Sequence, residues 1–171
     1  MRIMCIDPSS TQVGLALMDV EAFKDPVFLY GSSWEVKGDP TRLVMKCMEF
    51  SVRSFSAEVI LFEDQFYGRT SNSTTTKKIT IASGTILGAL LAERFRANPD
   101  ASKDVRIEYI YPRSWQTVLK GMPGESVKER SMSFANIWTG QHLGDDHIAD
   151  AANMGYYYGL LLTKRAIENG E

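Results

Sequence analysis

The stretch Arg2-Ile-Met-Cys-Ile-Asp7-Pro-Ser-Ser-Thr-Gln-Val-Gly14-Leu-Ala-Leu-Met18 decides the fold. One apolar run ends on the carboxylate of Asp7, a polar turn follows, and a second apolar run begins at Val13. Apolar runs bounded by turn residues are typical of buried strands, and Pro8 prevents a helix from continuing through the turn. We therefore expect Asp7 at the carboxyl end of a central strand, where open α/β sheets bind their ligands. A simple turn-forming role for Asp7 is the alternative.

Length and composition predict one globular domain over residues 1–171. The chain has 171 residues, of which 44% are hydrophobic and 23% are charged, which suits one core and is cramped for two. No apolar run approaches the about 20 residues that cross a bilayer, and no signal-peptide pattern is seen. We therefore expect a cytoplasmic protein without membrane contact. Cys5 and Cys47 form no CxxC pair, which argues against a structural zinc site.

The formal net charge is −2 at pH 7. Nucleic-acid-binding proteins are usually basic, so this value argues mildly against such a function. A cluster of metal-binding carboxylates, however, lowers the net charge without repelling phosphate once the metal is bound. The positions of the acidic residues are therefore more informative than their number.

A second apolar run, Val59-Ile-Leu-Phe62, also ends on a carboxylate, that of Glu63. The design of the first strand is thus repeated in the middle of the chain. If the two strands are parallel and adjacent, Asp7 and Glu63 project from the same edge of the sheet. Two strands that end in this way favour a functional site over two unrelated turns.

Strands and helices follow one another in the remaining sequence. Strands are predicted at residues 27–36, with a bulge near Gly31, and at 105–110, and helices at 39–57, 79–96, 115–119, 126–138 and 144–162. Ser126 and Glu129 have the spacing of a capping box. Gly84 and Gly88 would let the helix at 79–96 pack closely on a neighbour.

The last predicted helix carries a third acidic group. His147 and Asp150 are three residues apart, so they share one face near the start of this helix. Asp150 stands among alanine and isoleucine residues, where an unpaired charge is costly, and so it needs a partner. A divalent metal shared with Asp7 and Glu63 would be such a partner. A salt bridge to a lysine is the alternative.

Taken in order, these motifs resemble those of the RuvC family of Holliday-junction resolvases, which belong to the ribonuclease H-like nucleases. The resemblance covers nearly the whole chain and rests on Ile6-Asp7-Pro-Ser-Ser with Gly14, Phe62-Glu63-Asp-Gln-Phe, Tyr111-Pro through Lys120-Gly to Lys128, and His147-Ile-Ala-Asp150-Ala-Ala. It implies an α/β ribonuclease H-like fold, with a central mixed five-stranded sheet flanked by helices. It also implies a homodimeric, metal-dependent crossover junction endodeoxyribonuclease that makes paired symmetric nicks.

Carried over by position, the resemblance makes Asp7, Glu63, His147 and Asp150 the catalytic set, with two Mg²⁺ or Mn²⁺ ions in each active site. Two ions about 4 Å apart activate the attacking water and stabilise the leaving oxygen of a phosphodiester. Oxygen ligands favour these ions, and an imidazole shifts the preference slightly towards Mn²⁺. Many relatives have an aspartate at the position of His147, so Asp146 is the alternative fourth ligand.

Aromatic and basic residues near these motifs are candidates for contacts with branched DNA. Segment 66–78 follows Glu63 and carries groups that stack on bases or bind phosphate, although a plain surface loop is the alternative. The DNA-binding candidates are Phe66, Tyr67, Arg69, Lys77, Lys78, Arg113, Lys120 and Lys128. The helix at 79–96 is the candidate dimer interface. Three further aromatic residues are assigned to the core: Trp115, Phe134 and Trp138.

Three other functions fit parts of the pattern. A flap or general branched-DNA endonuclease, or an RNA-processing relative, would use the same site on another substrate. A catalytically inactive junction-binding module would tolerate His147 but would not need the three carboxylates. An actin-like kinase also opens with a strand, an aspartate and a hydroxyl-rich turn, but it needs two such domains. The short chain is consistent with a phage-encoded member that acts in the infected host, or with a protein of a bacterial cell.

Overall fold

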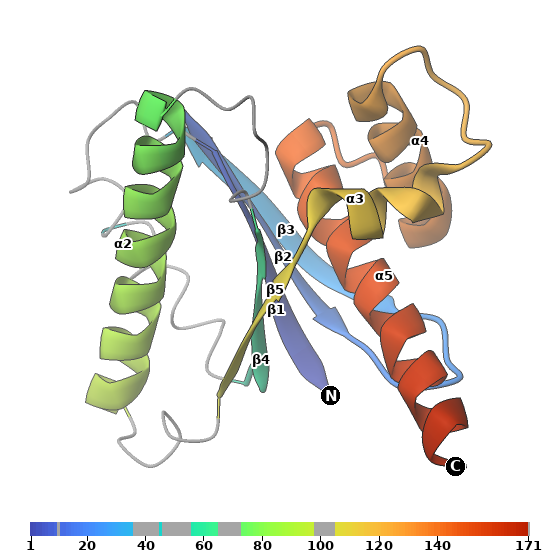
Figure 1. The fold of residues 1–171 in the computed structure, drawn as a ribbon, viewed down its shortest axis with the longest axis horizontal. Coiled ribbons are helices and arrows are strands. Elements are labelled where there is room, and N and C mark those ends of the chain that lie inside the picture. Colours follow the sequence, from blue (N-terminus) through green and yellow to red (C-terminus); the bar gives the residue numbers. More distant parts are fainter. Residues whose placement is uncertain (10, 36–44, 46–55, 65–72, 98–104, 171) are drawn as a thin grey trace.

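The computed structural model describes residues 1–9, 11–35, 45, 56–64, 73–97 and 105–170 (Figure 1). Its elements are β1 (Arg2–Pro8), β2 (Gln12–Asp19), β3 (Val27–Glu35), β4 (Val59–Glu63), α2 (Ser73–Ala97), β5 (Arg106–Ile110), α3 (Pro112–Trp115), the 3-10 helix η1 (Gln116–Leu119), α4 (Val127–Thr139) and α5 (Asp146–Asn169). The predicted helix at 39–57 lies almost entirely outside the described residues, as do residues 65–72.

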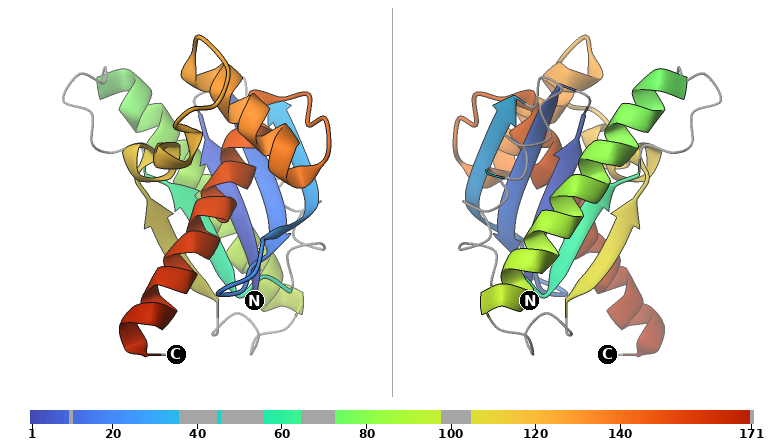
Figure 2. Two further views of the ribbon diagram at one scale, coloured as in Figure 1. Left: turned by 90° about the vertical axis from the view of Figure 1, so that its right-hand side faces the viewer. Right: turned by 90° about the vertical axis from the view of Figure 1, so that its left-hand side faces the viewer.

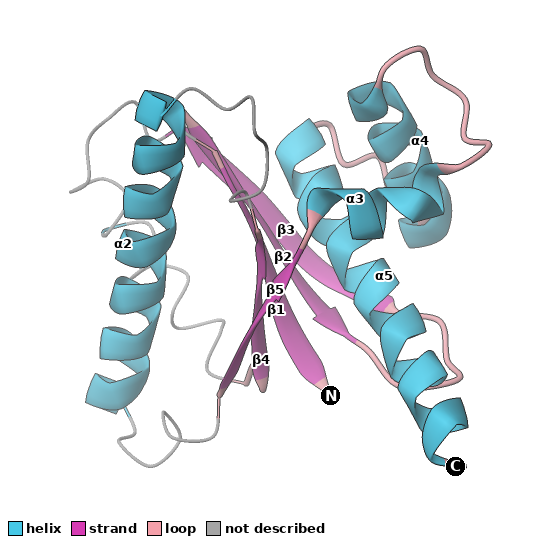
Figure 3. Ribbon diagram, in the orientation of Figure 1, coloured by secondary structure: helices cyan, strands magenta, loops and turns pink. Residues whose placement is uncertain are grey.

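The five strands form one mixed sheet in the order β3-β2-β1-β4-β5 (Figure 3). β1 pairs antiparallel with β2, and β2 with β3, whereas β4 is parallel to both β1 and β5. The predicted mixed five-stranded sheet is therefore confirmed. In the β1–β4 ladder, Ile6 is opposite Phe62, so Asp7 and Glu63 follow directly at the carboxyl ends of neighbouring parallel strands. The prediction that these two acids share one edge is also confirmed.

Helices cover both faces of the sheet, with α2 on one face and α3, η1, α4 and α5 on the other (Figures 1 and 2). Side chains along a strand alternate between the faces. In β1, Met4 and Ile6 join the core on the α2 side, whereas Ile3 and Cys5 join the core on the α5 side. The same alternation brings Asp7 to the α5 side. Burial on both faces explains why the central strands are continuous apolar runs.

Glycines allow α5 to lie unusually close to the sheet. A Cβ atom at Gly14 of β2 would stand 2.1 Å from the backbone oxygen of His147. In α5 itself, a Cβ atom at Gly155 would stand 2.3 Å from the sulfur of Met18. Since neither position leaves space for a methyl group, the first turn of α5 rests directly on β2, next to the end of β1. This contact brings His147 to Asp7.

A bulge does occur in the strand of Gly31, but two residues earlier, because Leu17 pairs with Tyr30 and Met18 with Phe28, which leaves Leu29 as the extra residue. The register shift between β2 and β3 lies between Leu17 and Met18, and Gly31 pairs regularly with Ala16. The glycine serves clearance instead, because a Cβ atom there would lie 2.5 Å from the side chain of Ile148. A glycine within a strand indicates either a bulge or a close approach, and here it is the second.

Two expectations about the helix at 79–96 also need correction. α2 begins at Ser73, so Lys77 and Lys78 lie on a helix rather than in a loop. The weak helix propensity of hydroxyl residues costs only a few tenths of a kcal/mol each and is outweighed by the long helix that follows. Gly84 and Gly88 are exposed, and within the described part of the chain nothing lies within 4 Å of a Cβ atom at either.

Helix starts follow the predicted capping chemistry. Ser126 and Glu129 form the reciprocal capping box of α4, and Asp145 caps α5 by accepting from the backbone N–H groups of His147 and Ile148. Among the helices that the structure describes, none is both long and apolar enough to cross a membrane.

Replacing these glycines by alanine tests the close approach of α5. We expect Gly14→Ala to lower the free energy of unfolding by about 3 kcal/mol or more, because the obstructing atoms are backbone, and Gly155→Ala by about 1 to 3 kcal/mol, because a methionine can move. Gly159→Ala is the control and should change the free energy of unfolding little. Its Cβ atom would lie 3.1 Å from Pro26, but a gain in helix propensity of up to about 1 kcal/mol offsets this tight contact. Urea unfolding measures all three, and equal effects would contradict the packing described.

Candidate active site

Three carboxylates converge where the ends of β1 and β4 face the start of α5. Asp7 is 5% exposed and Glu63 is 8% exposed, whereas Asp150 is half-buried in the second turn of the helix. The negative charges of Asp7 and Asp150 both act on Glu63. The structure thus brings together the three acids that the sequence singled out.

His147 is the immediate partner of Asp7. Its Nδ1 lies 2.7 Å from Oδ2 of Asp7. An ionised carboxylate only accepts hydrogen bonds, so Nδ1 carries a proton, and Nε2 is the ring nitrogen left for other partners. The hydrogen bond to Asp7 raises the pKa of His147, and this effect outweighs the burial that opposes it.

The other two acids are each held by one donor from the α3–α4 side of the fold. The indole Nε1 of Trp115 donates to Oε1 of Glu63 over 2.7 Å, and the hydroxyl of Ser131 donates to Oδ1 of Asp150. The partner of Asp150 is therefore a serine, not the lysine that was the alternative. Trp115 and Ser131 thus each fix one oxygen of the carboxylate that they bind.

Burial and mutual repulsion perturb the titration of the cluster. Burial, followed by the charge of Asp7, raises the pKa of Glu63 to about 8. The same two causes raise the pKa of Asp150 to about 7, against the opposing hydrogen bond from Ser131. A cation would stabilise the charged forms of two acids whose ionisation is disfavoured in this way.

The start of α5 is held by further polar contacts. Gln12 and Ser33, from β2 and β3, both donate to Oδ2 of its cap Asp145, over 2.7 and 2.8 Å. Asp146 forms an ion pair with Lys128 of α4. Burial acts to raise the pKa of Asp146, but the bond from Lys128 and the nearby His147 outweigh it and lower that pKa. Since its charge is already neutralised, Asp146 is a poorer candidate for the fourth ligand than His147.

The donor set suits a hard divalent cation. Carboxylate oxygens from Asp7, Glu63 and Asp150 are the ligands that Mg²⁺ and Mn²⁺ prefer, and the repulsion among them would be relieved by such an ion. Across the described residues, no three His, Cys, Asp or Glu side chains stand close enough to enclose an ion as they are.

Several solved resolvases have the same architecture as this chain. Thermus thermophilus RuvC in complex with a Holliday junction substrate has a TM-score of 0.68 at 22% identity, with 95% of this chain and 98% of that chain covered. The yeast mitochondrial Holliday junction resolvase Ydc2 has a TM-score of 0.58 at 16% identity, with 96% and 82% covered. Fowlpox virus resolvase, in complex with its substrate Holliday junction DNA, has a TM-score of 0.55 at 16% identity, with 95% and 99% covered.

The chain has the fold of the RuvC resolvases. No protein-family model and no curated protein matches it. At these identities the likeness establishes the ribonuclease H-like RuvC fold, and the chemistry must be argued from the residues of this chain. The expectation of a phage origin stays a prediction.

On this RuvC fold, the DNA-binding candidates fall into separate groups. Phe66, Tyr67 and Arg69 lie outside the described residues. Lys77 and Lys78 are exposed on α2, and Arg113 is exposed on α3. Lys120 borders a surface hollow of about 300 Å³ that Arg130 also lines. This hollow places two cations together on the α4 side of the sheet.

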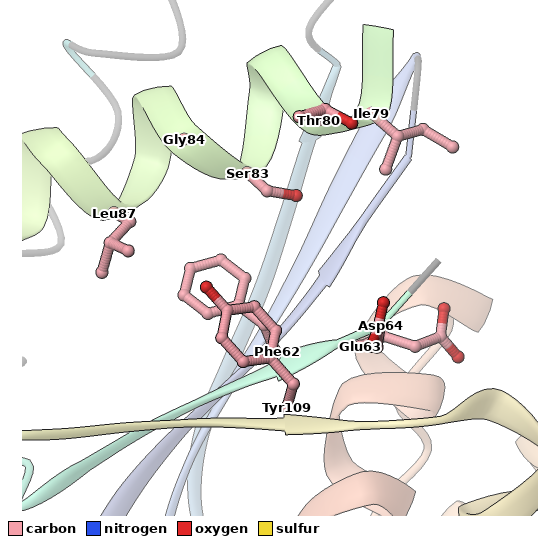
Figure 4. Close-up of a pocket in the computed structure, with 9 residues that line it drawn as sticks. All are labelled: Phe62, Glu63, Asp64, Ile79, Thr80, Ser83, Gly84, Leu87 and Tyr109. Atoms are coloured by element: carbon pink, nitrogen blue, oxygen red, sulfur yellow. The ribbon is translucent and has the colours of Figure 1, made fainter. Parts of the chain in front are cut away.

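A second hollow, of about 170 Å³, lies between α2 and the ends of β4 and β5. Figure 4 shows the rings of Phe62 and Tyr109 facing Ser83 and Leu87 of α2, with Glu63 at one side. The two rings are stacked, with their centroids 5.9 Å apart. An aromatic surface therefore adjoins the strand end that carries an acid of the cluster.

Sequence reasoning missed the residues that hold the acids in place. Trp115 was assigned to the core, and it is indeed fully buried, but its indole N–H needs a hydrogen-bond acceptor, which Glu63 supplies. Ser131 and Asn153 are fully buried polar residues in α4 and α5. A polar residue on the apolar face of each helix was the available signal, because such groups require partners.

The stability of the ion-free protein should fall as pH rises from about 5 to about 8. Folded Glu63 and Asp150 hold protons at pH values where the unfolded chain has released them, so each costs at most about 1.4 kcal/mol per pH unit across its interval. The contribution of His147 has the same sign, since it is present below its unfolded pKa and is lost as pH rises through the raised folded value.

Urea unfolding in EDTA at several pH values measures this slope. Glu63→Gln should flatten it, because glutamine cannot ionise yet still accepts from Trp115, and Mg²⁺ should restore stability mainly at the upper end. A free energy of unfolding that rises over this interval, or a slope unchanged in Glu63→Gln, would contradict the account.

Proposed function

We propose that this protein is a structure-selective DNA endonuclease, acting as a single nuclease domain, that resolves four-way junctions by paired symmetric nicks. The observation that carries the proposal is the convergence of Asp7, Glu63 and Asp150 at one point of a RuvC fold. Two proteins with this fold, Thermus thermophilus RuvC and fowlpox virus resolvase, have been solved in complex with a Holliday junction, which favours the junction over other branched substrates.

Asp7, Glu63 and Asp150 would hold Mg²⁺ or Mn²⁺, two ions to a site. When bound, such ions activate a water molecule and stabilise the leaving oxygen of the phosphodiester. Asp7 is central to this assignment, because its charge acts on both of the other acids.

His147 is suited to proton transfer or to orientation at the phosphodiester. Its Nδ1 is committed to Asp7, so Nε2 is the atom that can accept or donate a proton there. The raised pKa of His147 keeps the imidazolium form populated closer to neutral pH. Asp7 would therefore both hold the ion and set the orientation of the His147 ring.

Basic residues on two sides of the acidic cluster would contact the DNA backbone. We assign this role to Lys77 and Lys78 on one side, to Arg113, Lys120 and Lys128 on the other, and to Arg69, whereas Phe66 and Tyr67 would stack on bases. Lysine and arginine contacts to phosphate position a duplex without reading its sequence. If such contacts hold the duplex arms of branched DNA in fixed directions, the protein would be selective for a branch point.

A homodimer would place two such sites on one junction, because an isologous dimer and a four-way junction share two-fold symmetry. α2 supports this proposal, since Ile81 and Phe95 are 62% and 59% exposed. Gly88 lies midway between them at seven-residue spacing, and so on the same side of the helix. An exposed apolar face of this kind is typical of protein interfaces.

A labelled immobile four-way junction, a flap and a plain duplex, each incubated in Mg²⁺, Mn²⁺ or EDTA, test the proposed activity. We expect ion-dependent symmetric nicks on the junction, reduced at least about 100-fold in Asp7→Asn. Asp19→Asn is the matched control: Asp19 lies at the opposite end of the same sheet, ion-paired with Arg2, and its loss should leave the nicking rate unchanged.

Each other result has a defined meaning. Equal cutting of flaps would show a general branched-DNA endonuclease. Tight junction binding without nicks in either ion would show a catalytically inactive junction-binding module. Nicking that survives Asp7→Asn would remove the acidic cluster from the mechanism.

Light scattering tests the dimer. We expect the wild-type protein to be dimeric at micromolar concentration and the Ile81→Lys/Phe95→Lys variant to be monomeric, with paired nicks replaced by single nicks. Ile137→Lys, at a position of α4 that is 65% exposed, controls for the added charge. A monomeric wild type, or a variant that stays dimeric, would contradict the assignment of α2.

A further inference from the structure

A continuous line of hydrogen bonds runs from the surface of α4 to Asp150. The indole Nε1 of Trp138 lies 3.0 Å from Oδ1 of Asn153. Nδ2 of Asn153 lies 2.8 Å from the hydroxyl of Ser131 and 2.9 Å from its backbone oxygen, and that hydroxyl contacts Oδ1 of Asp150. Ser131 and Asn153 are fully buried, so none of these bonds can be exchanged for water without cost.

The donor in every step is determined by chemistry. An indole N–H can only donate, so the amide oxygen of Asn153 faces Trp138 and its NH₂ group faces Ser131. The Ser131 hydroxyl therefore accepts from Asn153, and its single proton is directed to Asp150. The ring of Trp138 is itself held between Phe28 and Tyr156, at centroid distances of 6.4 and 5.3 Å.

This geometry does more than join α4 to α5. The line ends on one oxygen of Asp150, and no other described side chain hydrogen-bonds the second oxygen. Fixing Oδ1 sets the rotation of the carboxylate and leaves Oδ2 for an ion. A hydroxyl of α4 need not reach this acid at all, as Thr139 illustrates: its hydroxyl bonds the backbone oxygen of Ala135 within the same helix.

We propose that Trp138, Asn153 and Ser131 are positioning residues that orient Asp150 and reserve its Oδ2 for a divalent cation. The proposal rests on the proposed function, which supplies the cation. Partners of this kind typically change ion affinity by about 10- to 100-fold when they are removed. The role belongs to the line as a unit, because each member orients only the next.

Mn²⁺ binding to the full-length protein, measured as the loss of the electron paramagnetic resonance signal of free Mn²⁺, tests the inference without catalysis. We expect Ser131→Ala to weaken binding by about tenfold or more. Ser131→Thr should keep wild-type affinity within about threefold, although its added methyl group destabilises a fully buried position. Ser131→Thr would then lower stability without lowering the affinity for Mn²⁺. A serine with only a structural role would not show this separation.

Coupling provides a second readout. Asn153→Leu should weaken Mn²⁺ binding by a factor similar to that of Ser131→Ala, and the double variant should be weaker than either single variant by less than about twofold. Thr139→Ala, which removes a hydroxyl from the same helix, should retain wild-type affinity. Fully additive losses of Mn²⁺ affinity in the double variant would overturn the inference that Asn153 orients Asp150 through Ser131.

Failure of this inference is distinguishable from failure of the proposed function. Unchanged Mn²⁺ affinity in Ser131→Ala, alongside wild-type binding and junction nicking, would overturn the positioning role alone. Mn²⁺ binding that responds to Ser131→Ala in a protein that nicks no DNA would uphold the positioning role and overturn the activity. A wild-type protein that does not bind Mn²⁺ would overturn both.

Discussion

Three carboxylates meet in a largely buried space, and the repulsion between their charged forms is the constraint on which the rest of the site depends. Asp7 and Glu63 reach it from adjacent parallel strands, so their spacing is set by the sheet itself. Asp150 arrives from α5, whose approach needs a residue without a side chain at Gly14. Burying like charges costs free energy that a cation would return. The cost is therefore a reason to infer a bound ion.

The fold limits this cost by holding each acid through one oxygen. His147, Trp115 and Ser131 are the three donors, and they come from α5, α3 and α4. The helices on this face of the sheet thus do more than cover a core, because each positions one group of the acidic cluster. A scaffold that gives every carboxylate of the cluster its own donor fixes the acids in place, as pre-organised sites require.

The local pattern of the sequence was sufficient for the framework and for the acids. Apolar runs that end on Asp7 and Glu63 indicated two buried strands with an acid at the end of each, and the spacing of His147 and Asp150 placed both on one helical face. Long-range contacts could not be derived in this way. Gly31 was interpreted as a bulge because a strand glycine does not reveal that Ile148 lies above it. Trp115 was assigned to the core because a buried tryptophan gives the same sequence pattern whether or not its indole N–H donates to Glu63. Nothing local links Asn153 to Ser131, because their contact exists only once α4 packs on α5.

Diffraction from crystals grown with Mn²⁺, recorded so that manganese scatters anomalously, tests the central claim most directly. The account predicts two anomalous peaks about 4 Å apart, flanked by oxygens of Asp7, Glu63 and Asp150, with the Ser131 hydroxyl still on Oδ1 of Asp150. It also predicts the loss of these peaks in Asp7→Asn. Manganese bound only elsewhere on the surface, with the three carboxylates still on their protein donors, would contradict it.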